Sequence, residues 1–350
     1  LRMEEVETKS FNQLISKIYS VVYKNFQVQI INTQLPNFFT LLIFAIILNI
    51  SSLTSRLTLD VLGVTVRLFQ SLSNVSSSLN KVIKYIMDLK IRDKVALVTG
   101  GATGIGKSVS LDLAKEGAIV VITSRNQKNI DSTIKELRNY NKNCFGICTD
   151  ISKVNQPKLI MKKILKKLRT IDIVVNNVGD TLNIKNPYCG VDDWIKLFNL
   201  ILGVAIRINN LAIPVMKRNR WGRIVNITAG AAMENSGPVP YCSLKSAFNA
   251  YSRSMARVLA SEKSNIVMSA VLPGLVLTER GHWSKVLKTN PGHAKKYLRE
   301  RTTLKRFGTP EEISPIVTLM CSDLASFCIG SSIPVEGGQA RHFFQKVSDF

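Results

Sequence analysis

The sequence lacks the patterns of several common classes of binding protein. It shows no zinc-finger spacing, no basic region followed by heptads, no interleaving of aromatic and basic residues, and no internal repeats. Nucleic acid is therefore not an expected partner. Its six cysteines form no paired metal-binding pattern, so we expect reduced thiols in a cytoplasmic protein and no metal site. They are Cys144, Cys148, Cys189, Cys242, Cys321 and Cys328.

Acidic residues are also scarce. The 350 residues include 24 Asp and Glu against 47 Lys and Arg, which gives a formal net charge of +23. Net charge bears on solubility and partners rather than on fold. One interpretation is an anionic partner, such as a small molecule, a carrier protein or acidic lipid headgroups. The alternative is a lysine-rich composition spread over solvent-exposed helices.

Long hydrophobic runs are missing as well. The uncharged segment between Lys24 and Arg56 contains a mostly apolar stretch at 38–48 (FFTLLIFAIIL), which is short for a membrane span unless its flanks contribute. A membrane contact through residues 25–55 is one hypothesis. The alternative is a non-essential extension, because Met87 begins a segment with which a compact enzyme would naturally start.

We therefore predict a mostly helical N-terminal extension over residues 1–86 and a single large domain over residues 87–345. The extension does not resemble a clean secretory signal, since its apolar part comes late and no small-residue cleavage site is obvious. The expected location is the cytoplasm, with membrane association if the extension inserts into a bilayer.

A glycine-rich turn follows the first clear strand, within Lys94–Gly106 (KVALVTGGATGIG). The apolar run at 95–98 predicts a strand buried on both faces, and Val109 and Leu113 then recur at helical spacing. A helix N-terminus favours an anion, and glycines let the backbone approach it. The turn therefore predicts a nucleotide-phosphate site, with an ordinary structural turn as the alternative. Its residues are Gly100, Thr103, Gly104, Ile105 and Gly106.

From residue 91 onward, strand-like apolar segments alternate with amphipathic helical ones. Helices are predicted near residues 105–116, 127–140, 153–169 and 241–262. This alternation predicts an α/β fold of the Rossmann type, a doubly wound parallel sheet of about seven strands with helices on both faces. Its ligand should lie beyond the carboxyl ends of the strands, where the strand order reverses.

The second predicted strand ends in Ser124 and Arg125. An enzyme that prefers NAD(H) would place an acidic residue here for the ribose hydroxyls, whereas these side chains suit a 2′-phosphate. NADP(H) is therefore the predicted cofactor, with NAD(H) as the alternative. If neither is bound, Arg125 is an ordinary surface residue.

The next two strands also end in candidate cofactor residues. Asp150 and Ile151 follow the third strand, where Asp150 is predicted to lie near the adenine or else to cap the next helix. Asn177, Val178 and Gly179 follow the fourth. A glycine at this point admits the cofactor, and asparagine side chains can brace neighbouring strands.

Tyr241 and Lys245 lie four residues apart in a predicted helix and so share one face. An ammonium beside a phenol stabilises the phenolate and lowers the tyrosine pKa, so that the phenol can exchange a proton with a substrate oxygen. This pair alone is weak evidence, but it gains weight from the glycine turn and the strand-end motifs before it.

Together these motifs resemble the short-chain dehydrogenase/reductase family, in particular its members that resemble 3-oxoacyl-carrier-protein reductases. The matching segments are TGGATGIG (99–106), NNVG (176–179), YCSLK (241–245), PGLVLT (273–278), RFGTPEEI (306–313) and the closing VEGG. The resemblance covers about residues 88–340. It implies a nicotinamide cofactor, hydride transfer and a homodimer or homotetramer.

The resemblance also implies roles for individual residues. Tyr241 would be the acid/base, and Lys245 would hold the cofactor ribose and lower the tyrosine pKa. The PGLVLT segment would close over the nicotinamide through Pro273, Gly274 and Val276, with Thr278 near the pyrophosphate.

Two positions depart from the family pattern. The family's substrate-binding serine falls at Ala229 or Thr228, depending on the direction of counting, and Thr228 is the candidate that could replace its hydroxyl. The family's asparagine for the proton relay falls at Ile201, and Asn199 lies on the wrong face of the helix. We therefore expect either reduced catalysis or a cofactor-binding protein with little of it.

The segment 279–306 is a predicted substrate flap with nine Lys and Arg against two Glu. It predicts an anionic small-molecule substrate, such as an acyl thioester or a nucleotide sugar, unless the flap is only a solvated helix. Three hypotheses therefore follow: an NADP(H)-dependent oxidoreductase, a catalytically weakened cofactor-binding protein, and a membrane-tethered interaction protein that rests on residues 25–55 alone.

Overall fold

The computed structural model describes residue 70 and residues 88–234, 236–279 and 281–339. The chain separates into two units, Leu1–Met87 and Asp88–Phe350, and the second unit carries the fold described below. The predicted helices of the N-terminal extension and the hypothetical membrane contact at 25–55 lie outside the described residues.

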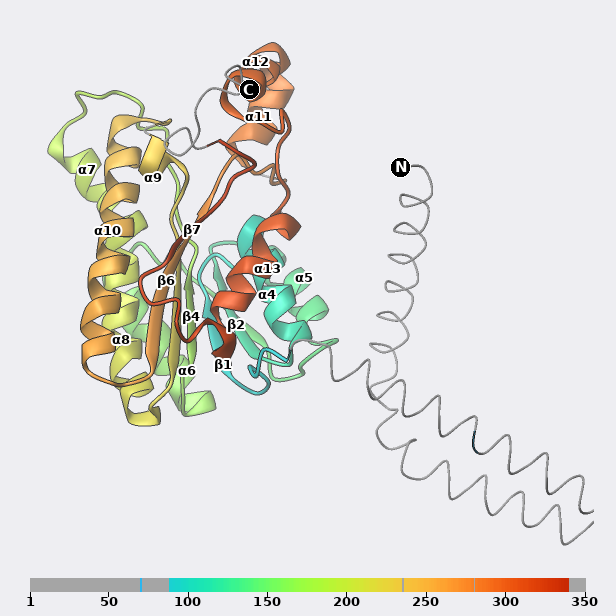
Figure 1. The fold of residues 1–350 in the computed structure, drawn as a ribbon, viewed down its shortest axis with the longest axis vertical. Coiled ribbons are helices and arrows are strands. Elements are labelled where there is room, and N and C mark those ends of the chain that lie inside the picture. The colour runs from blue at the N-terminus through green and yellow to red at the C-terminus, as the bar shows by residue number, and fades with distance from the viewer. Residues whose placement is uncertain (1–69, 71–87, 235, 280, 340–350) are drawn as a thin grey trace, which may run out of the picture. The chain divides into compact units, whose positions relative to one another are not determined.

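Seven strands form one parallel sheet in the order β3-β2-β1-β4-β5-β6-β7 (Figure 1). They are β1 (Val95–Val98), β2 (Ile119–Ser124), β3 (Phe145–Cys148), β4 (Ile173–Asn176), β5 (Gly222–Ile227), β6 (Ile266–Pro273) and β7 (Ser332–Val335). The central strands are apolar along their length because helices cover both of their faces. The predicted doubly wound sheet is confirmed.

Three helices pack on each face of the sheet (Figure 1). One face carries α4 (Gly104–Lys115), α5 (Gln127–Leu137) and α13 (Pro310–Met320), and the other carries α6 (Gln156–Leu168), α8 (Val204–Asn219) and α10 (Val239–Ser261). The predicted helices match these within a few residues. The flap contains α11 (His282–Thr289) and α12 (Pro291–Arg301), and the short elements are α9 (Ala231–Glu234) and η2 (Asp323–Ala325).

A π-helix interrupts the long helical segment before β5. The segment runs from α7 (Val191–Phe198) through the π-helix η1 (Asn199–Gly203) into α8. Among the described residues, this stretch, Val191–Asn219, is the one long and apolar enough to cross a membrane, but 61% of its most apolar window is buried within the domain. Its apolar character is accounted for by the core.

The strand order reverses between β1 and β4, which opens a crevice at their carboxyl ends. The backbone amide of Thr99 donates to Val175 O at 3.0 Å, and the Asn177 side chain donates to Thr99 O at 2.9 Å. These bonds hold the glycine turn after β1 beside the segment after β4. The bracing role predicted for an asparagine here is therefore present.

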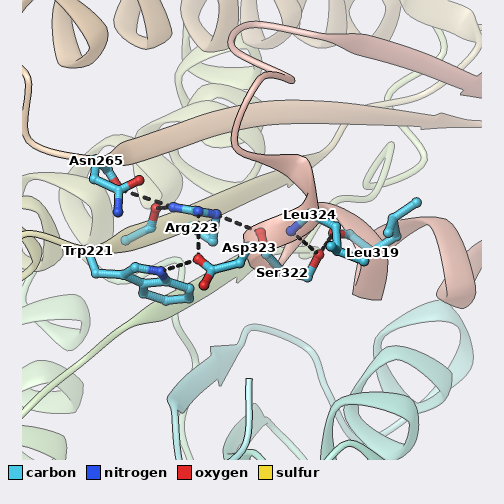
Figure 2. Close-up of polar contacts among 8 residues, drawn as sticks. Trp221, Arg223, Asn265, Leu319, Ser322, Asp323 and Leu324 are labelled. Atoms are coloured by element: carbon cyan, nitrogen blue, oxygen red, sulfur yellow. Dashed lines mark hydrogen bonds and ion pairs between the residues drawn. The ribbon is translucent and has the colours of Figure 1, made fainter. Parts of the chain in front are cut away.

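At the opposite end of the sheet, a buried arginine ties three segments together (Figure 2). Arg223 in β5 is completely buried, and it donates to Ser322 O at 2.8 Å, Asn265 O at 3.0 Å and Asp323 Oδ1 at 3.1 Å. The indole of Trp221 also donates to Asp323, at 2.6 Å, and stacks on the guanidinium. This network fastens the start of β6 and the loop before β7 to β5.

We expect the substitution Arg223→Met to lower the free energy of unfolding by about 3 kcal/mol, because it leaves buried carbonyl oxygens and Asp323 without their donor. Asp323 is 41% exposed, which keeps the loss below that of a fully buried pair. Urea unfolding of the full chain measures it. The control is Glu136→Gln, which breaks the half-exposed Lys107–Glu136 pair and should cost less than about 1 kcal/mol. Equal losses in the two variants would contradict the assignment.

Candidate active site

The predicted cofactor-binding and catalytic residues come together around one cavity of about 480 Å³, which lies at the carboxyl ends of the central strands. Of the predicted residues, Gly106 alone is absent from its wall. The wall contains Gly100, Thr103, Gly104, Ile105, Ser124, Arg125, Asp150, Ile151, Asn177, Val178, Gly179, Thr228, Tyr241, Lys245, Pro273, Gly274, Val276 and Thr278.

The glycine turn has the geometry of an anion cradle. Gly100 and Gly104 have φ angles of +65° and +53°, which side chains rarely tolerate. A Cβ atom on Gly106 would lie 2.4 Å from Gly100 O, so this glycine allows α4 to pack closely on the turn. The Thr103 side chain makes no capping hydrogen bond, and the first turn of α4 contains no acidic residue. The helix N-terminus therefore offers its amides to an anion in the cavity.

The far end of the cavity lies beyond β2 and β3. Arg125 is exposed in its wall, next to Ser124, and no acidic residue ends β2. The Asp150 carboxylate accepts from the Ser152 hydroxyl at 2.7 Å and from its amide at 3.2 Å, and these bonds lower the pKa of Asp150. The N-cap of α6 is Asn155, so the alternative in which Asp150 caps that helix is wrong.

Lys245 lies on the floor of the cavity. It is 2% exposed, and its Nζ donates to Ile227 O at 2.9 Å and lies 5.8 Å from the centre of the Tyr241 ring. Burial lowers the pKa of Lys245 to about 7. A Cβ atom on Gly179 would lie 2.9 Å from this Nζ, so the glycine after β4 leaves room for the ammonium.

The pKa of Tyr241 moves in the direction opposite to the expected one. Burial raises it, and the charges of Cys242 and Asp180 add to the increase. The expectation that Lys245 lowers this pKa is therefore not met in the structure, because burial disfavours the charged phenolate. The phenol stays protonated at neutral pH and is available as a proton donor.

Both candidate serine positions line the cavity. Thr228 and Ala229 follow Ile227, the last residue of β5, and the backbone bonds from Thr228 N to Val271 O and from Gly230 N to Pro273 O continue the pairing with β6. The Thr228 hydroxyl donates to Val271 O at 3.4 Å, which directs its proton to β6.

The candidate asparagine position is apolar. Ile201 is completely buried against Leu197 and Phe248, and it does not line the cavity. Asn199 at the start of η1 accepts a hydrogen bond from Arg207 instead, at 2.5 Å. The cavity receives Leu200 from this segment. The π-helix that places these residues has no recognisable signal in the sequence.

The cavity wall also contains residues that were not predicted as site residues, and Asp180, Leu182, His282 and Trp283 are four of them. Asp180 and Leu182 follow the NNVG motif directly, while His282 and Trp283 begin the flap after Thr278. Their adjacency to predicted motifs is the signal that could have found them. The described residues contain no cluster of three or more His, Cys, Asp or Glu side chains suited to a metal ion, and the six cysteines are free.

The buried Lys245 predicts a specific pH dependence of stability. Its pKa is about 7 when folded and has its ordinary value of 10.5 in an unfolded chain, so between these values the unfolded state binds more protons and stability rises with pH. Lys245→Met removes this pH-dependent contribution to the free energy of unfolding. The free energy of unfolding of the variant minus that of the wild type should therefore fall between pH 7 and 9, by at most about 1.4 kcal/mol per pH unit. Urea unfolding at each pH measures this, with the exposed Lys288→Met as control, and a constant difference would contradict it.

The comparisons with known proteins agree with this geometry. The family described as short chain dehydrogenase matches residues 94–285. A 3-oxoacyl-[acyl-carrier-protein] reductase of Aquifex aeolicus is 31% identical over 254 residues, which cover 72% of this chain and 99% of that protein.

Solved structures of similar fold contain a reduced nicotinamide cofactor or use one. The L-sorbose reductase of Gluconobacter frateurii, in complex with NADPH and L-sorbose, is 25% identical with a TM-score of 0.69, over 73% of this chain and all of that one. An NADPH-dependent reductase involved in bacilysin biosynthesis, YwfH, is 26% identical with a TM-score of 0.67, over 72% of this chain and all of that one. The chain therefore belongs to the short-chain dehydrogenase/reductase family of NAD(P)-dependent oxidoreductases.

Proposed function

We propose that the protein is an NADP(H)-dependent reductase that interconverts a carbonyl and a hydroxyl group, with Tyr241 as the proton donor. The observation that carries the proposal is the placement of Tyr241 and the buried Lys245 on one face of α10, in the cavity that the glycine turn also lines. A buried cation and a protonated phenol beside a phosphate cradle suit this reaction.

The cavity fits NADP(H). The amides at the start of α4 would hold the pyrophosphate, and Arg125 would pair with the extra phosphate of NADP(H), since no acidic side chain competes at the end of β2. Lys245 donates one hydrogen bond to Ile227 O, and an ammonium has three donors, so two remain for ribose hydroxyls.

The protein residues would direct the proton rather than the hydride. When bound, the nicotinamide supplies the hydride to the carbonyl carbon. The Tyr241 hydroxyl donates its proton to the carbonyl oxygen, and the raised pKa of Tyr241 keeps this proton available at neutral pH. Lys245 fixes the cofactor ribose and stabilises the phenolate that the proton transfer leaves behind.

A second candidate function is a nicotinamide-binding protein with little catalysis. It is favoured by the Thr228 hydroxyl, which is directed to Val271 O, and by the buried Ile201. Together they leave the neighbourhood of Tyr241 without the two polar groups that the family pattern provides. Loss of orienting groups commonly costs orders of magnitude in rate without abolishing the chemistry.

The proposed substrate carries its negative charge on a part that stays outside the cavity. The flap lysines Lys285, Lys288, Lys295 and Lys296 are exposed, form no ion pair with another described residue, and do not line the cavity. They would attract a charged tail, such as a nucleotide or a carrier-bound thioester, while the carbonyl end enters.

A cytoplasmic homodimer or homotetramer completes the proposal. The free cysteines support a reducing compartment. An exposed apolar stripe of α7, formed by Val191, Ile195 and Phe198, supports a contact between copies.

Replacement of Tyr241 by Phe should lower ketone reduction by about a hundredfold or more, because the proton donor is lost while the cavity keeps its shape. NADPH oxidation by the full chain measures this, over a panel with an acetoacetyl thioester, a keto nucleotide sugar and a diketone. NADPH binding, followed by fluorescence titration, should be unchanged. NADPH should be preferred over NADH because of Arg125. Wild-type protein that binds NADPH without turnover would support the second candidate function, and retained turnover in the variant would contradict the role of Tyr241.

Reversal of the flap charge by Lys295→Glu with Lys296→Glu should raise KM several-fold for the keto nucleotide sugar and leave KM for the neutral diketone unchanged. The effect should fade as salt is raised from low to physiological ionic strength, because exposed charges are screened. Steady-state kinetics at two salt concentrations measure this. Equal changes for both substrates would remove the anionic-substrate proposal.

A further inference from the structure

The cavity wall holds two polar side chains that the proposed reaction does not use. Asp180 follows Gly179 after β4, and His282 begins α11 in the flap. Both line the cavity together with Tyr241, although they come from segments far apart in the sequence. Neither belongs to the phosphate cradle or to the Tyr241–Lys245 pair, so their position beside the phenol needs its own explanation.

Asp180 is oriented with one carboxylate oxygen still available. Its Oδ1 accepts a hydrogen bond from the Leu182 amide at 3.1 Å, and within the described residues no hydrogen bond reaches Oδ2. The charge of Asp180 acts on the pKa of both Tyr241 and His282, and all three residues line the same cavity. It can therefore accept a proton donor carried by a molecule in the cavity.

His282 is positioned by the aromatic side chain that follows it. The Trp283 ring packs on Tyr297 at 4.7 Å and on Phe307 at 5.4 Å between ring centres. The Tyr297 hydroxyl donates to Ser236 O at 3.1 Å, in the segment that leads into α10. These contacts hold the start of the flap against the approach to the helix that carries Tyr241.

The imidazole of His282 is free to bind a ligand. Neither of its ring nitrogens makes a hydrogen bond with another described residue; the ring makes only an edge contact with Trp283. Burial lowers the pKa of His282, and the charge of Lys185 adds to this effect. A neutral imidazole offers one donor and one acceptor.

Apolar side chains line this cavity as well. Leu182, Leu200, Ala229 and Trp283 line it. Sites for small molecules commonly combine apolar walls with a few polar groups that fix orientation. Here those groups are an acceptor, a neutral donor and the Tyr241 phenol.

We propose that Asp180 and His282 bind a hydroxyl group of the substrate, so that the preferred substrate is a ketone with a hydroxyl group beside its carbonyl. This inference rests on the proposed function of the same site. The substrate hydroxyl donates to Asp180 and accepts from His282, while the carbonyl oxygen accepts from Tyr241. L-Sorbose, the ligand in the similar sorbose reductase, is a ketone of this class.

A matched pair of ketones tests this on the full chain with NADPH. α-Hydroxyacetophenone and acetophenone differ by one hydroxyl group, and both carry a ring that suits the apolar wall. The wild type should prefer the hydroxylated ketone in kcat/KM by about tenfold to a hundredfold, because a site built to bind a hydroxyl group rejects the analogue without it. The difference should lie mainly in KM.

Two variants and one control test whether Asp180 and His282 cause the preference for the hydroxylated ketone. Asp180→Leu and His282→Phe should each reduce the preference, which is a ratio of two kcat/KM values, to less than threefold, because the hydroxyl group then loses a partner that acetophenone never had. Lys163→Gln, an exposed position on α6 outside the cavity wall, should leave the preference unchanged. A wild type without preference, or a preference that survives both substitutions, would overturn the inference.

Calorimetric titration of the two ketones into the protein with NADPH separates this inference from the proposed function. Tighter binding of α-hydroxyacetophenone that is lost in both variants supports the inference even without turnover, in which case the reductase proposal alone fails. Equal affinity for the two ketones overturns the inference whether or not the protein is active.

Discussion

The site is organised around one buried cation, the Lys245 ammonium bonded to Ile227 O. Burial of a lysine is costly, and here the cost is visible as a pKa lowered to about 7. The surrounding chain accommodates it at defined points. Gly179 has no side chain to collide with it, and α10 runs beside the end of β5 so that its carbonyl is within reach. The position of Tyr241 follows, because it lies one helical turn before Lys245.

Polar contacts join neighbouring segments at both ends of the sheet, and the carboxyl end carries the cavity. At the carboxyl ends, the Asn177 side chain and the Thr99 amide leave a crevice open between β1 and β4. At the opposite end, Arg223 in β5 bonds to two other segments, the residue before β6 and the loop before β7 (Figure 2).

The sequence was sufficient for the fold and for the cofactor end of the cavity, because both depend on local patterns. Apolar runs alternate with helical periodicity, and glycines with positive φ mark the turn at Gly100 and Gly104. It was insufficient where long-range packing decides. The direction of the Tyr241 pKa depends on how deeply the folded chain buries the phenol, and the entry of Leu200 rather than Ile201 into the cavity depends on a π-helix. The position of His282 in the cavity wall could not be predicted, because it depends on how the flap folds.

The residues that hold the proton donor Tyr241 and those proposed to recognise the substrate belong to different parts of the fold. The residues that hold the proton donor belong to the sheet and α10, which are buried and mutually packed. Ala229 and Ile201 place apolar side chains where the family pattern has polar ones. The remaining polar groups, Asp180 and His282, belong to segments that follow β4 and β6. Such segments can change with little loss of stability, because few core contacts depend on them. A fold built in this way can keep one reaction while its substrate changes through the loops alone.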